Sequence, residues 1–509
     1  MKRTRPRVEI NLPELEQILE QARQIPLTDR DYQKLKHALH TLVELLKPVR
    51  NTERTEAVLA ETTGRAETEP SVSATEPKMR PGHGRNGAAD FTGARRVAIR
   101  NAQLQSGDRC PACQIGKVYR QKKPKPLVRI VGQAPLAATV YELERWRCNA
   151  CGQVFTAAAP EEVGPNQYDE STAAMIAQLK YGSGVPFYRL EKLQASLGIP
   201  LPAATQWEIV EEAGESIKPA WDELIRQAAQ GEVLYNDDTR MRVLRLAREP
   251  SDQRTGVFTS GIVSTQQGQQ IARYFTGRQQ AGENLADVLR ERRAELCPPV
   301  QMCDALSRNV PKLPTGVEVS LANCLAHGRR QFVDIAANFP AECRYVLEQL
   351  RRVYRYDAET CEMNADERLL FHQQHSAPVM DELHHWLVAQ LAEKKTEPNS
   401  GLGKAITYLL RHWQPLTLFL QKKQAPLDSN LVERALKRAV LHRKNALHYR
   451  TLHGAAVGDL FMSLIHTCEL CRVNSFDYLT QLQRHARELA ADPARWLPWN
   501  YQATLAQNA

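Results

Sequence analysis

The sequence predicts a multidomain α+β protein, and three observations lead to this class. At 509 residues the chain is too long for one hydrophobic core, so about three to four domains are expected. Near Glu232 the apolar residues change from helical spacing to the alternation typical of strands. Two Cys-x-x-Cys pairs in the first third of the chain have the pattern of zinc ligands. We therefore expect a strand-containing core, flanking helices and a small metal-binding module.

The composition is that of a globular protein able to bind nucleic acid. Hydrophobic residues make up 42% and charged residues 25%, and 67 Lys and Arg against 58 Asp and Glu give a formal charge of +9. This balance permits nucleic-acid binding without establishing it, because the clustering of charge decides. No apolar run approaches the ~18 residues that span a bilayer, and the start MKRTRPRVEI lacks the apolar segment of a secretory signal. We expect a cytoplasmic protein with no membrane partner, whose cysteines are thiols or metal ligands.

The first 108 residues predict helices followed by a linker. Leucines at helical spacing in residues 11–46 predict two helices joined near Pro26, so residues 1–50 form an N-terminal helical region. The second helix suits dimerisation with a copy of itself, and packing within its own domain is an equal alternative. Residues 51–108 are poor in aromatics and rich in Thr, Glu, Gly, Ala and Arg, which predicts a flexible linker.

Residues 109–158 predict a zinc-ribbon-like module. Cys110-Pro-Ala-Cys113 and Cys148-Asn-Ala-Cys151 each place two thiolates on one tight turn. Two such turns complete a tetrahedral structural Zn²⁺ site, and strands are expected at residues 127–131 and 139–147 between them. Four unrelated cysteines are the alternative.

Residues 165–230 predict a helical DNA-binding region with the order of a helix-turn-helix. Helices are expected at residues 171–181, 188–197 and 202–214, with turns that contain glycine. This order can place a recognition helix in a DNA groove. The third helix is acidic, however, so a plain three-helix bundle fits equally well.

Residues 231–323 predict the first part of a ribonuclease-H-like core. The expected order is three strands, a helix and a fourth strand. The strands are 232–244, 256–265, 269–277 and 300–306, and the helix is 282–296. The alternation of residues along these strands identifies two candidate aspartates.

Asp237 and Asp304 are the candidate catalytic and metal-binding aspartates. Each alternates in phase with apolar residues of its strand. These are Val233, Tyr235, Met241 and Val243 for Asp237, and Val300 and Met302 for Asp304. A carboxylate in the apolar phase of a strand is costly unless a cation compensates it. Asp238 lies in the opposite phase, so we favour Asp237 as the ligand.

Glu433 is the third candidate carboxylate, within LDSNLVERALKRAVLHRKNALHYRTLHG. The helix expected here carries one carboxylate among many basic groups, which suits an enzyme that holds metal against DNA. An ordinary helix with exposed charges is the alternative. We expect a helical insertion at residues 324–427, the catalytic helix and completion of the core at 428–470, and a C-terminal tail at 471–509.

The three carboxylates offer only oxygen ligands, the donor set of two Mg²⁺ or Mn²⁺ ions. Two such ions can activate a water or a 3′-hydroxyl and stabilise the leaving oxygen in phosphoryl transfer. Basic and polar side chains near them are candidates for DNA binding. They are His327, Arg330, Arg434, Lys437, Arg438, Arg443 and Lys444. For His327, packing or capping of a helix is an equal alternative.

Together these segments resemble the DDE transposases of the insertion-sequence-66 family. The resemblance runs along most of the chain and is most specific around Glu433. The matching segments are KYGSGVPFYRLEKLQASL (180–197), the Asp-acid-Thr sequence 237–239, the run 324–332, HSAPVMDELHHWL (375–387), GLGKAITYLLRHWQPLTLFL (401–420), DSNLVERALKRAVLHRKN (428–445) and ARWLPWNY (494–501). The resemblance implies a transposase that nicks its element's ends and joins the 3′-hydroxyls to target DNA. Asp237, Asp304 and Glu433 would be its metal-binding triad.

The resemblance also implies partners. These are double-stranded DNA of element ends and target, a second copy in a homodimer or higher oligomer that pairs two ends, and accessory proteins encoded by the same element. The location would be cytoplasmic and nucleoid-associated. The chain departs from the family where Asp237-Asp238-Thr239 replaces Asp-Glu-Thr, and where residues 305–309 replace a Gly-Tyr run. A degenerate copy that acts as a DNA-binding repressor, and a nuclease that cuts without joining, are the alternative functions.

Overall fold

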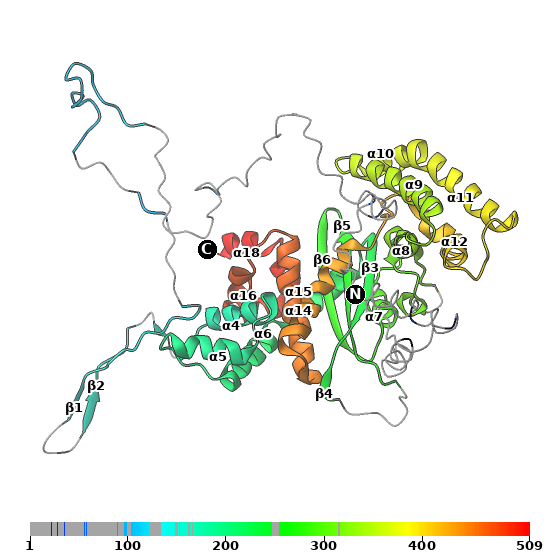
Figure 1. The fold of residues 1–509 in the computed structure, drawn as a ribbon. Coiled ribbons are helices and arrows are strands. Elements are labelled where there is room, and N and C mark those ends of the chain that lie inside the picture. The colour runs from blue at the N-terminus through cyan, green and yellow to red at the C-terminus, as the bar shows by residue number, and fades with distance from the viewer. Residues whose placement is uncertain are drawn as a thin grey trace. The chain divides into compact units, whose positions relative to one another are not determined.

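The computed structural model describes residues 103–121, 134–147, 153–160, 166–246, 254–313 and 316–508, with shorter stretches at 22, 28, 35, 55, 58, 89, 96–98, 151 and 163–164. Two compact units are present (Figure 1). The insertion unit comprises His327–Arg411 with Met1–Ala66, and the core unit comprises Glu67–Ala326 with His412–Ala509. The helices expected in residues 11–46, and most of the expected linker, lie outside the described residues.

A five-stranded mixed sheet forms the centre of the core unit, in the order β6-β5-β3-β7-β8. The strands are β3 (Val233–Arg240), β5 (Phe258–Gln266), β6 (Gln269–Gly277), β7 (Val300–Cys303) and β8 (Ser320–Asn323). β5 is antiparallel to β3 and β6, whereas β3, β7 and β8 run parallel. This mixed α+β arrangement is consistent with the ribonuclease-H-like core that the sequence predicts.

Local sequence explains the hairpin and the end of the fourth strand. β5 and β6 are joined by Gln267 and Gly268, both at positive φ (48° and 81°), as a tight hairpin turn requires. The strand expected at 300–306 ends instead at Cys303. Asp304 lies just after the strand. Its carboxylate accepts the backbone N–H of Leu306 (3.2 Å), and the chain then turns into η3 (Ser307–Asn309).

Helices cover both faces of the sheet, so the position of Asp237 in the apolar phase of its strand is not a valid reason to prefer it over Asp238. Helix α7 (Ala281–Leu289) packs on Leu234 of β3, and α14 (Asn430–Ala446) packs on the opposite face. Asp238 is therefore more buried than Asp237, although the alternation placed Asp237 in the apolar phase. Alternation cannot identify one buried face when helices cover both.

Helix α15 (Leu452–Leu470) covers the edge strand β6, as Figure 1 shows. An uncovered edge would expose unpaired backbone groups. Thr467 Oγ1 accepts the N–H of Ala272 at 3.1 Å, and Ser463 Oγ accepts that of Tyr274 at 3.0 Å. Asp459 accepts the N–H of the next residue in this alternation, Thr276. The helical spacing of four residues thus matches the two-residue spacing of a strand edge.

Helices that precede or follow the sheet strands in the chain build the rest of the core unit. They are α4 (Glu170–Ala177), η2 (Gln178–Gly182), α5 (Phe187–Ser196), α6 (Ala203–Ala229), α13 (Trp413–Leu416), η5 (Leu418–Leu420), α16 (Ser475–Arg484), α17 (Ala486–Ala491), η6 (Pro493–Trp496) and α18 (Tyr501–Asn508). The third helix of the expected helix-turn-helix is 27 residues long, and its buried face joins the main hydrophobic cluster.

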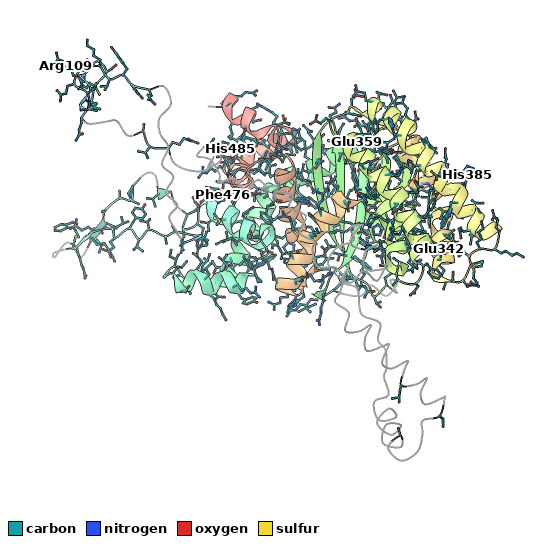
Figure 2. All side chains as sticks on the ribbon, turned by 45° about the horizontal axis from the view of Figure 1, so that its top comes forward. Arg109, Glu342, Glu359, His385, Phe476 and His485 are labelled. Atoms are coloured by element: carbon teal, nitrogen blue, oxygen red, sulfur yellow. The ribbon has the colours of Figure 1, made fainter. Side chains whose placement is uncertain are left out.

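The C-terminal residues, expected as a tail, are packed helices. Trp496, Tyr478 and Tyr501 are each at most 1% exposed. Tyr478 donates to the carbonyl of Trp496 (2.9 Å), and His485 stacks on the Trp496 ring at 4.8 Å between centroids. Figure 2 labels His485 together with Phe476 in these helices. Aromatic burial therefore fixes this segment on the core unit.

The insertion unit is helical, as the sequence predicts for most of residues 324–427. Its elements are α8 (Leu325–Ile335, which begins in the core unit), α9 (Pro340–Glu359), α10 (Ala365–Phe371), the π-turn η4 (His372–Ser376), α11 (Ala377–Ala392) and α12 (Gly401–Arg411). Figure 2 labels Glu342 and Glu359 near the two ends of α9, and His385 on α11. No described helix of either unit is both long and apolar enough to cross a membrane.

Candidate active site

Asp237 and Asp304 come together around one amide. The side-chain nitrogen of Asn309 donates to Asp304 Oδ1 at 2.5 Å and lies 3.4 Å from Asp237 Oδ1. Asp237 comes from the middle of β3, and Asp304 directly follows β7, the parallel neighbour of β3. The two carboxylates, 67 positions apart in the numbering, are therefore brought to one place by the pairing of these strands.

A buried amide network holds Asn309 in position. The main-chain carbonyl oxygen of Asn309 accepts hydrogen bonds from the side chains of Asn236 (2.7 Å) and Gln301 (2.8 Å). Gln301 also donates to Asn236 Oδ1 at 2.9 Å, and all three residues are fully buried. Because buried polar groups are costly unless they are paired, this network fixes the loop after β7.

The acidic pair is electrostatically strained. Burial, and next the charge of Asp304, raise the pKa of Asp237 to about 6, although the hydrogen bonds from Asp238 N–H and Asn309 act in the opposite direction. Two carboxylates in one partly buried place favour a cation. With oxygen donors only, the pair fits Mg²⁺ or Mn²⁺ better than a softer metal.

Asp238 instead supports the structure around the site. Its side chain is 1% exposed, pairs with Arg308 at 3.2 Å, and accepts the backbone N–H of Ala281 at the start of α7. Burial raises its pKa, and Arg308 and this N–H act in the opposite direction. Asp238 thus ties the loop after β7 to the N-terminus of α7, where a carboxylate is favourable.

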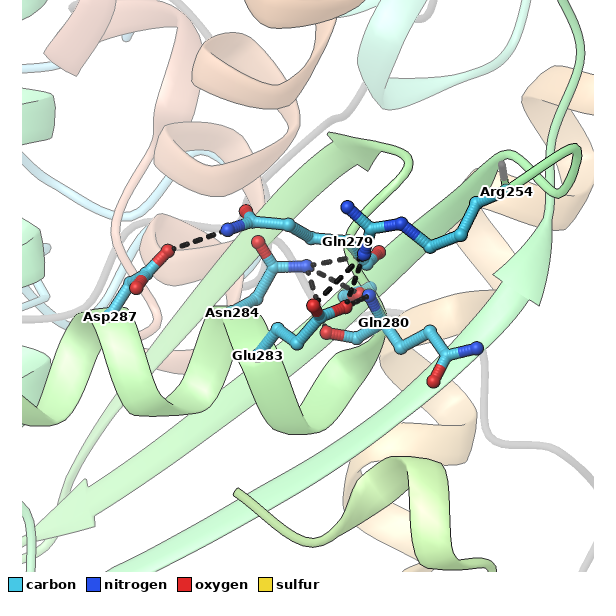
Figure 3. A network of polar contacts seen from close by, with 7 residues as sticks. Arg254, Gln279, Gln280, Glu283, Asn284 and Asp287 are labelled. Carbon is cyan, nitrogen blue, oxygen red and sulfur yellow. Dashed lines mark hydrogen bonds and ion pairs between the residues drawn. The ribbon is translucent and has the colours of Figure 1, made fainter. Parts of the chain in front are cut away.

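The same helix start carries a further polar network, drawn in Figure 3. Arg254 binds both carboxylate oxygens of Glu283 (2.9 and 3.1 Å), and Glu283 accepts the backbone N–H of Gln280 (2.8 Å) as part of a capping box. Asn284 donates to Ser260 Oγ on β5 at 2.9 Å. These bonds fix the N-terminus of α7 against the sheet.

Glu433 lies in the first turn of α14, beside the strand ends. A Cβ on Gly261, the residue paired with Asp237, would lie 3.0 Å from Leu436 and 3.5 Å from Val432. The absence of a side chain on Gly261 therefore lets α14 approach the sheet next to Asp237.

Contacts at the start of α14 relate Glu433 to the end of β8. Ser429 Oγ donates to the Glu433 carboxylate at 3.3 Å, and the N–H of Ser429 points to Cys324 Sγ at 3.3 Å. Cys324 directly follows β8, and its N–H donates to the carbonyl of Cys303, the residue before Asp304 (2.9 Å). A Glu433 oxygen and Cys324 Sγ lie within 4.8 Å of one another. Glu433 is thus near the end of the sheet from which Asp304 emerges.

The five predicted basic residues of α14 divide into two groups. Arg434, Lys437 and Lys444 are exposed. Arg438 donates to the carbonyl of Gly182 (2.9 Å) and pairs with Glu469, and Arg443 donates to Thr239 Oγ1 (2.9 Å). The guanidinium groups of Arg438 and Arg443 therefore hold α14 to neighbouring elements, which leaves the first three as the better candidates for DNA contact.

His327 and Arg330, the other predicted DNA-binding residues, lie on α8 in the insertion unit. Both are half-buried. Their contact with DNA stays a prediction.

The first cysteine pair lies on a tight turn. The N–H of Cys110 donates to the carbonyl of Gly116, and that of Gln114 to the carbonyl of Cys110, both at 2.8 Å. The backbone N–H groups of Gly116 and Ile115, with the Cys110 side chain, lower the pKa of the exposed Cys113 thiol. Both features suit metal ligation. Figure 2 labels Arg109, the residue before this turn.

The second cysteine pair is only partly described. Cys148 lies outside the described residues, and Cys151 is exposed. The pair falls between β1 (Arg145–Arg147) and β2 (Val154–Thr156), which form an antiparallel hairpin. Of the strand expected at 139–147, only the last three residues form a strand, which is β1. The strand expected at 127–131 lies outside the described residues. A zinc ribbon is not shown, and the zinc site stays a prediction.

Sequence patterns alone did not identify three residues of this network, Asn236, Gln301 and Asn309. The available signal was an amide side chain on each of two expected strands, because a buried amide is costly unless it is hydrogen-bonded. Their joint role depends on strand pairing, which the spacing of single residues does not reveal.

Comparison with known proteins identifies the family of the chain. Residues 165–457, more than half of the chain, match the family model described as "Transposase IS66 family". The uncharacterized protein y4jD of Sinorhizobium fredii is 26% identical over 428 residues, which cover 79% of this chain and 80% of that protein. The uncharacterized protein y4hP of the same organism is 24% identical over 388 residues, or 70% and 67% of the two chains.

Proposed function

Because the chain belongs to the IS66 family of transposases, we propose that it is an active DDE transposase, which cleaves strands at the ends of an insertion element and transfers them to target DNA. The observation that carries the proposal is the meeting of Asp237 and Asp304 at Asn309. Helix α14, which carries Glu433, packs through Val432 and Leu436 on Gly261, the residue paired with Asp237. Family membership implies transposition and DNA binding, and it suggests a phosphoryl-transfer enzyme.

Asp237, Asp304 and Glu433 would hold two Mg²⁺ or Mn²⁺ ions through carboxylate oxygens. Such ions supply activation of a water or a 3′-hydroxyl and stabilisation of the leaving oxygen. Asn309 orients the aspartates, and Asp238 keeps α7 and the loop after β7 in place. Arg434, Lys437 and Lys444 offer exposed positive charge on the helix that carries Glu433, which suits a phosphate backbone.

Other parts of the proposal follow from the family and the sequence. A homodimer or higher oligomer would pair two element ends, with accessory proteins of the same element as further candidate partners. Residues 109–158 would form a structural zinc module. Contacts from His327 and Arg330 would add to DNA binding.

The test uses purified protein, labelled element ends, a target plasmid and Mg²⁺. Asp237→Asn, Asp304→Asn and Glu433→Gln should each lower the yield of joined product by at least about 10²–10³-fold, the scale for loss of a group that stabilises transition-state charge. Glu208→Gln, an exposed residue of α6, is the matched control and should keep activity. Thermal unfolding of each variant shows whether the fold is retained.

The alternatives predict different products. Wild-type protein that shifts the ends but leaves them uncut would support a degenerate, DNA-binding repressor. Cleavage without joining would support a nuclease. Joined product from any of the three carboxylate variants at the wild-type level would remove that residue from the proposed triad.

A further inference from the structure

A two-stranded parallel ribbon lies beyond the end of β3, outside the residues assigned to the site. It is formed by β4 (Val243–Arg245) and β9 (Tyr449–Thr451), the segments that follow β3 and α14. Figure 1 shows β4 at one end of the sheet, below β3. Five exposed cations belong to this region, which we call the basic ribbon: Arg240, Arg242, Arg245, Lys444 and Arg450. Of these, only Lys444, near the end of α14, is already a candidate DNA contact.

The alternation of burial sets the direction of these side chains. Met241 and Val243 are 7% and 9% exposed and join the main hydrophobic cluster, whereas Arg240 and Arg242 are exposed. On the partner strand, buried Tyr449 pairs with Val243 and is followed by exposed Arg450. Because alternate residues of a strand point to opposite faces, Met241 and Val243 anchor the ribbon while Arg240 and Arg242 point to solvent. Arg245 has the phase of Val243 but is exposed at the end of β4.

Among the described residues, no carboxylate neutralises this positive charge. Residues 239–246 and 443–453 contain no Asp or Glu. Within the described part of the chain, none of the five cations forms an ion pair. Glu211 pairs with His453 (2.6 Å) on the segment that follows Arg450, and not with one of these cations. Most surface charge is mixed in sign, so an uncompensated cluster of this kind favours a polyanion.

The basic ribbon continues the exposed positive face of α14. That helix packs on Gly261, opposite Asp237, and farther along Arg443 donates to Thr239 Oγ1 and to the carbonyl of Arg240. The helix and β3 therefore run side by side from the acidic pair to the ribbon. Arg434 and Lys444 are separated by about 15 Å of helix, at ~1.5 Å per residue.

The distance from the acidic pair matches several base pairs. Arg242 and Arg245 follow Asp237 by five and eight residues, or about 17 and 26 Å of extended chain. With a rise of ~3.4 Å along the helix axis for each phosphate of one strand, this is about 5–8 base pairs. Arginine is suited to such a contact because its guanidinium can bind two phosphate oxygens at once.

We propose that the basic ribbon grips the phosphate backbone of duplex DNA about 5–8 base pairs from the reacting phosphate, without reading sequence. The inference rests on the proposed function, since it places the reacting phosphate at the acidic pair. It adds a second, distal contact on the same duplex, which keeps the DNA axis along α14.

Binding to a duplex of arbitrary sequence tests the charge contribution. We compare the full-length protein with Arg242→Gln/Arg245→Gln/Arg450→Gln over a salt series without divalent metal. Each phosphate contact contributes about 0.9 to the slope of log affinity against log salt concentration, so the slope should fall by about 2–3. The affinity near 0.1 M salt should fall about 10- to 100-fold.

Two control variants separate charge from folding. Arg226→Gln/Arg290→Gln/Arg487→Gln removes three exposed arginines elsewhere in the core unit and should leave the slope unchanged. Arg242→Lys/Arg245→Lys/Arg450→Lys keeps the charge and should restore most of it. A slope equal for the ribbon variant and the first control would overturn the inference.

An element end tests the position. Ethylation of phosphates about 5–8 base pairs from the cleaved bond should weaken binding by the wild type but not by the glutamine variant. Equal interference in both proteins contradicts the inference, even if the wild type cleaves and joins DNA, in which case the proposed function stands. A wild type that shows this interference but never cleaves contradicts the proposed activity and leaves the ribbon contact supported.

Discussion

At the scale of single residues, the acidic pair depends on a neutral side chain. Asn309 donates to Asp304 and lies within reach of Asp237, and its own carbonyl is held by Asn236 and Gln301. The backbone of residue 309 is thus fixed separately from its side chain. An amide suits this place because it offers donors to two carboxylates without a positive charge that would compete with a metal ion.

Asn309→Ala should remove the donor and keep the loop. A hydrogen bond to a charged group contributes about 1.5–3 kcal/mol, so the Mg²⁺ concentration for half-maximal strand cleavage should rise about 10-fold, with a smaller change at saturating Mg²⁺. Cleavage measured across a Mg²⁺ titration checks this. Asn338→Ala, an exposed asparagine of the insertion unit, should behave as wild type. An unchanged Mg²⁺ requirement in Asn309→Ala would remove Asn309 from the site.

At the scale of elements, the approach of α14 to the sheet depends on Gly261. A methyl group there would meet Leu436 at 3.0 Å and Val432 at 3.5 Å, so the helix or the strand must shift by a few tenths of an ångström. Gly261→Ala should therefore lower strand cleavage by more than 10-fold, since small misplacements of reacting groups cost about 10²-fold. The loss of stability should be about 1–3 kcal/mol.

Gly277→Ala is the matched control for this substitution. Gly277 ends β6 in the same sheet, and an added Cβ meets nothing within 4 Å. Its cleavage rate and urea midpoint should remain close to wild type. Equal activity in the Gly261 and Gly277 variants would show that the spacing of α14 does not control the site.

The covering of β6 by α15 makes stability depend on pH. Burial raises the pKa of Asp459 to about 7, although Thr276 donates to its carboxylate through N–H and Oγ1, the latter at 2.7 Å. An acid with a raised pKa binds its proton more tightly in the folded state, so the free energy of unfolding falls as pH rises from about 4 to about 7. Asp237 acts in the same direction.

Asp459→Asn should reduce this fall, by several kcal/mol at most, since one pKa unit corresponds to about 1.4 kcal/mol. Urea unfolding at a series of pH values between about 4.5 and 8 measures it. Asp222→Asn on α6, whose native carboxylate pairs with Lys218 at the surface, is the control. An identical pH slope in Asp459→Asn and wild type would contradict the assignment.

At the scale of the whole molecule, we propose that the segment around Cys110 and Cys113 needs a metal ion for its fold. The turn at Cys110 is formed by backbone bonds within a short exposed segment, and the described residues 103–121 belong to neither of the two hydrophobic clusters named above. A module of this size needs a bound metal ion or a covalent cross-link to stay folded.

We therefore expect one zinc ion per chain, lost in Cys110→Ser and retained in Cys297→Ser, an exposed cysteine outside the module. Metal analysis of the purified proteins checks this. Cys110→Ser should also expose the segment to protease, because zinc binding and folding are coupled. The same zinc content in both variants would rule out Cys110 as a ligand.

The order of helices and strands follows largely from sequence, because it depends on local periodicity. The strands near residues 233–245, 258–266 and 269–277 are where the alternation of residues predicts them. The candidate carboxylates Asp237, Asp304 and Glu433 also come from the sequence, and their role as a triad stays a prediction; the resemblance is most specific around Glu433. Local patterns did not give the length of α6 or the helical packing of the C-terminus, because both depend on burial against distant segments.

Sequence by itself thus determined the family, the mixed α+β class and the candidate triad, since each depends on residue types in chain order. Only the tertiary structure decided which groups meet. Parallel pairing of β3 with β7 brings Asp237 to Asp304. The side-chain amides of Asn236 and Gln301 bind the main-chain carbonyl of Asn309 and so hold the residue that bridges the two aspartates. Helices on both faces bury Asp238 more than Asp237, against the alternation rule. The arginines of the basic ribbon form one surface only because β4 pairs with a strand about 200 residues away, which no local pattern encodes.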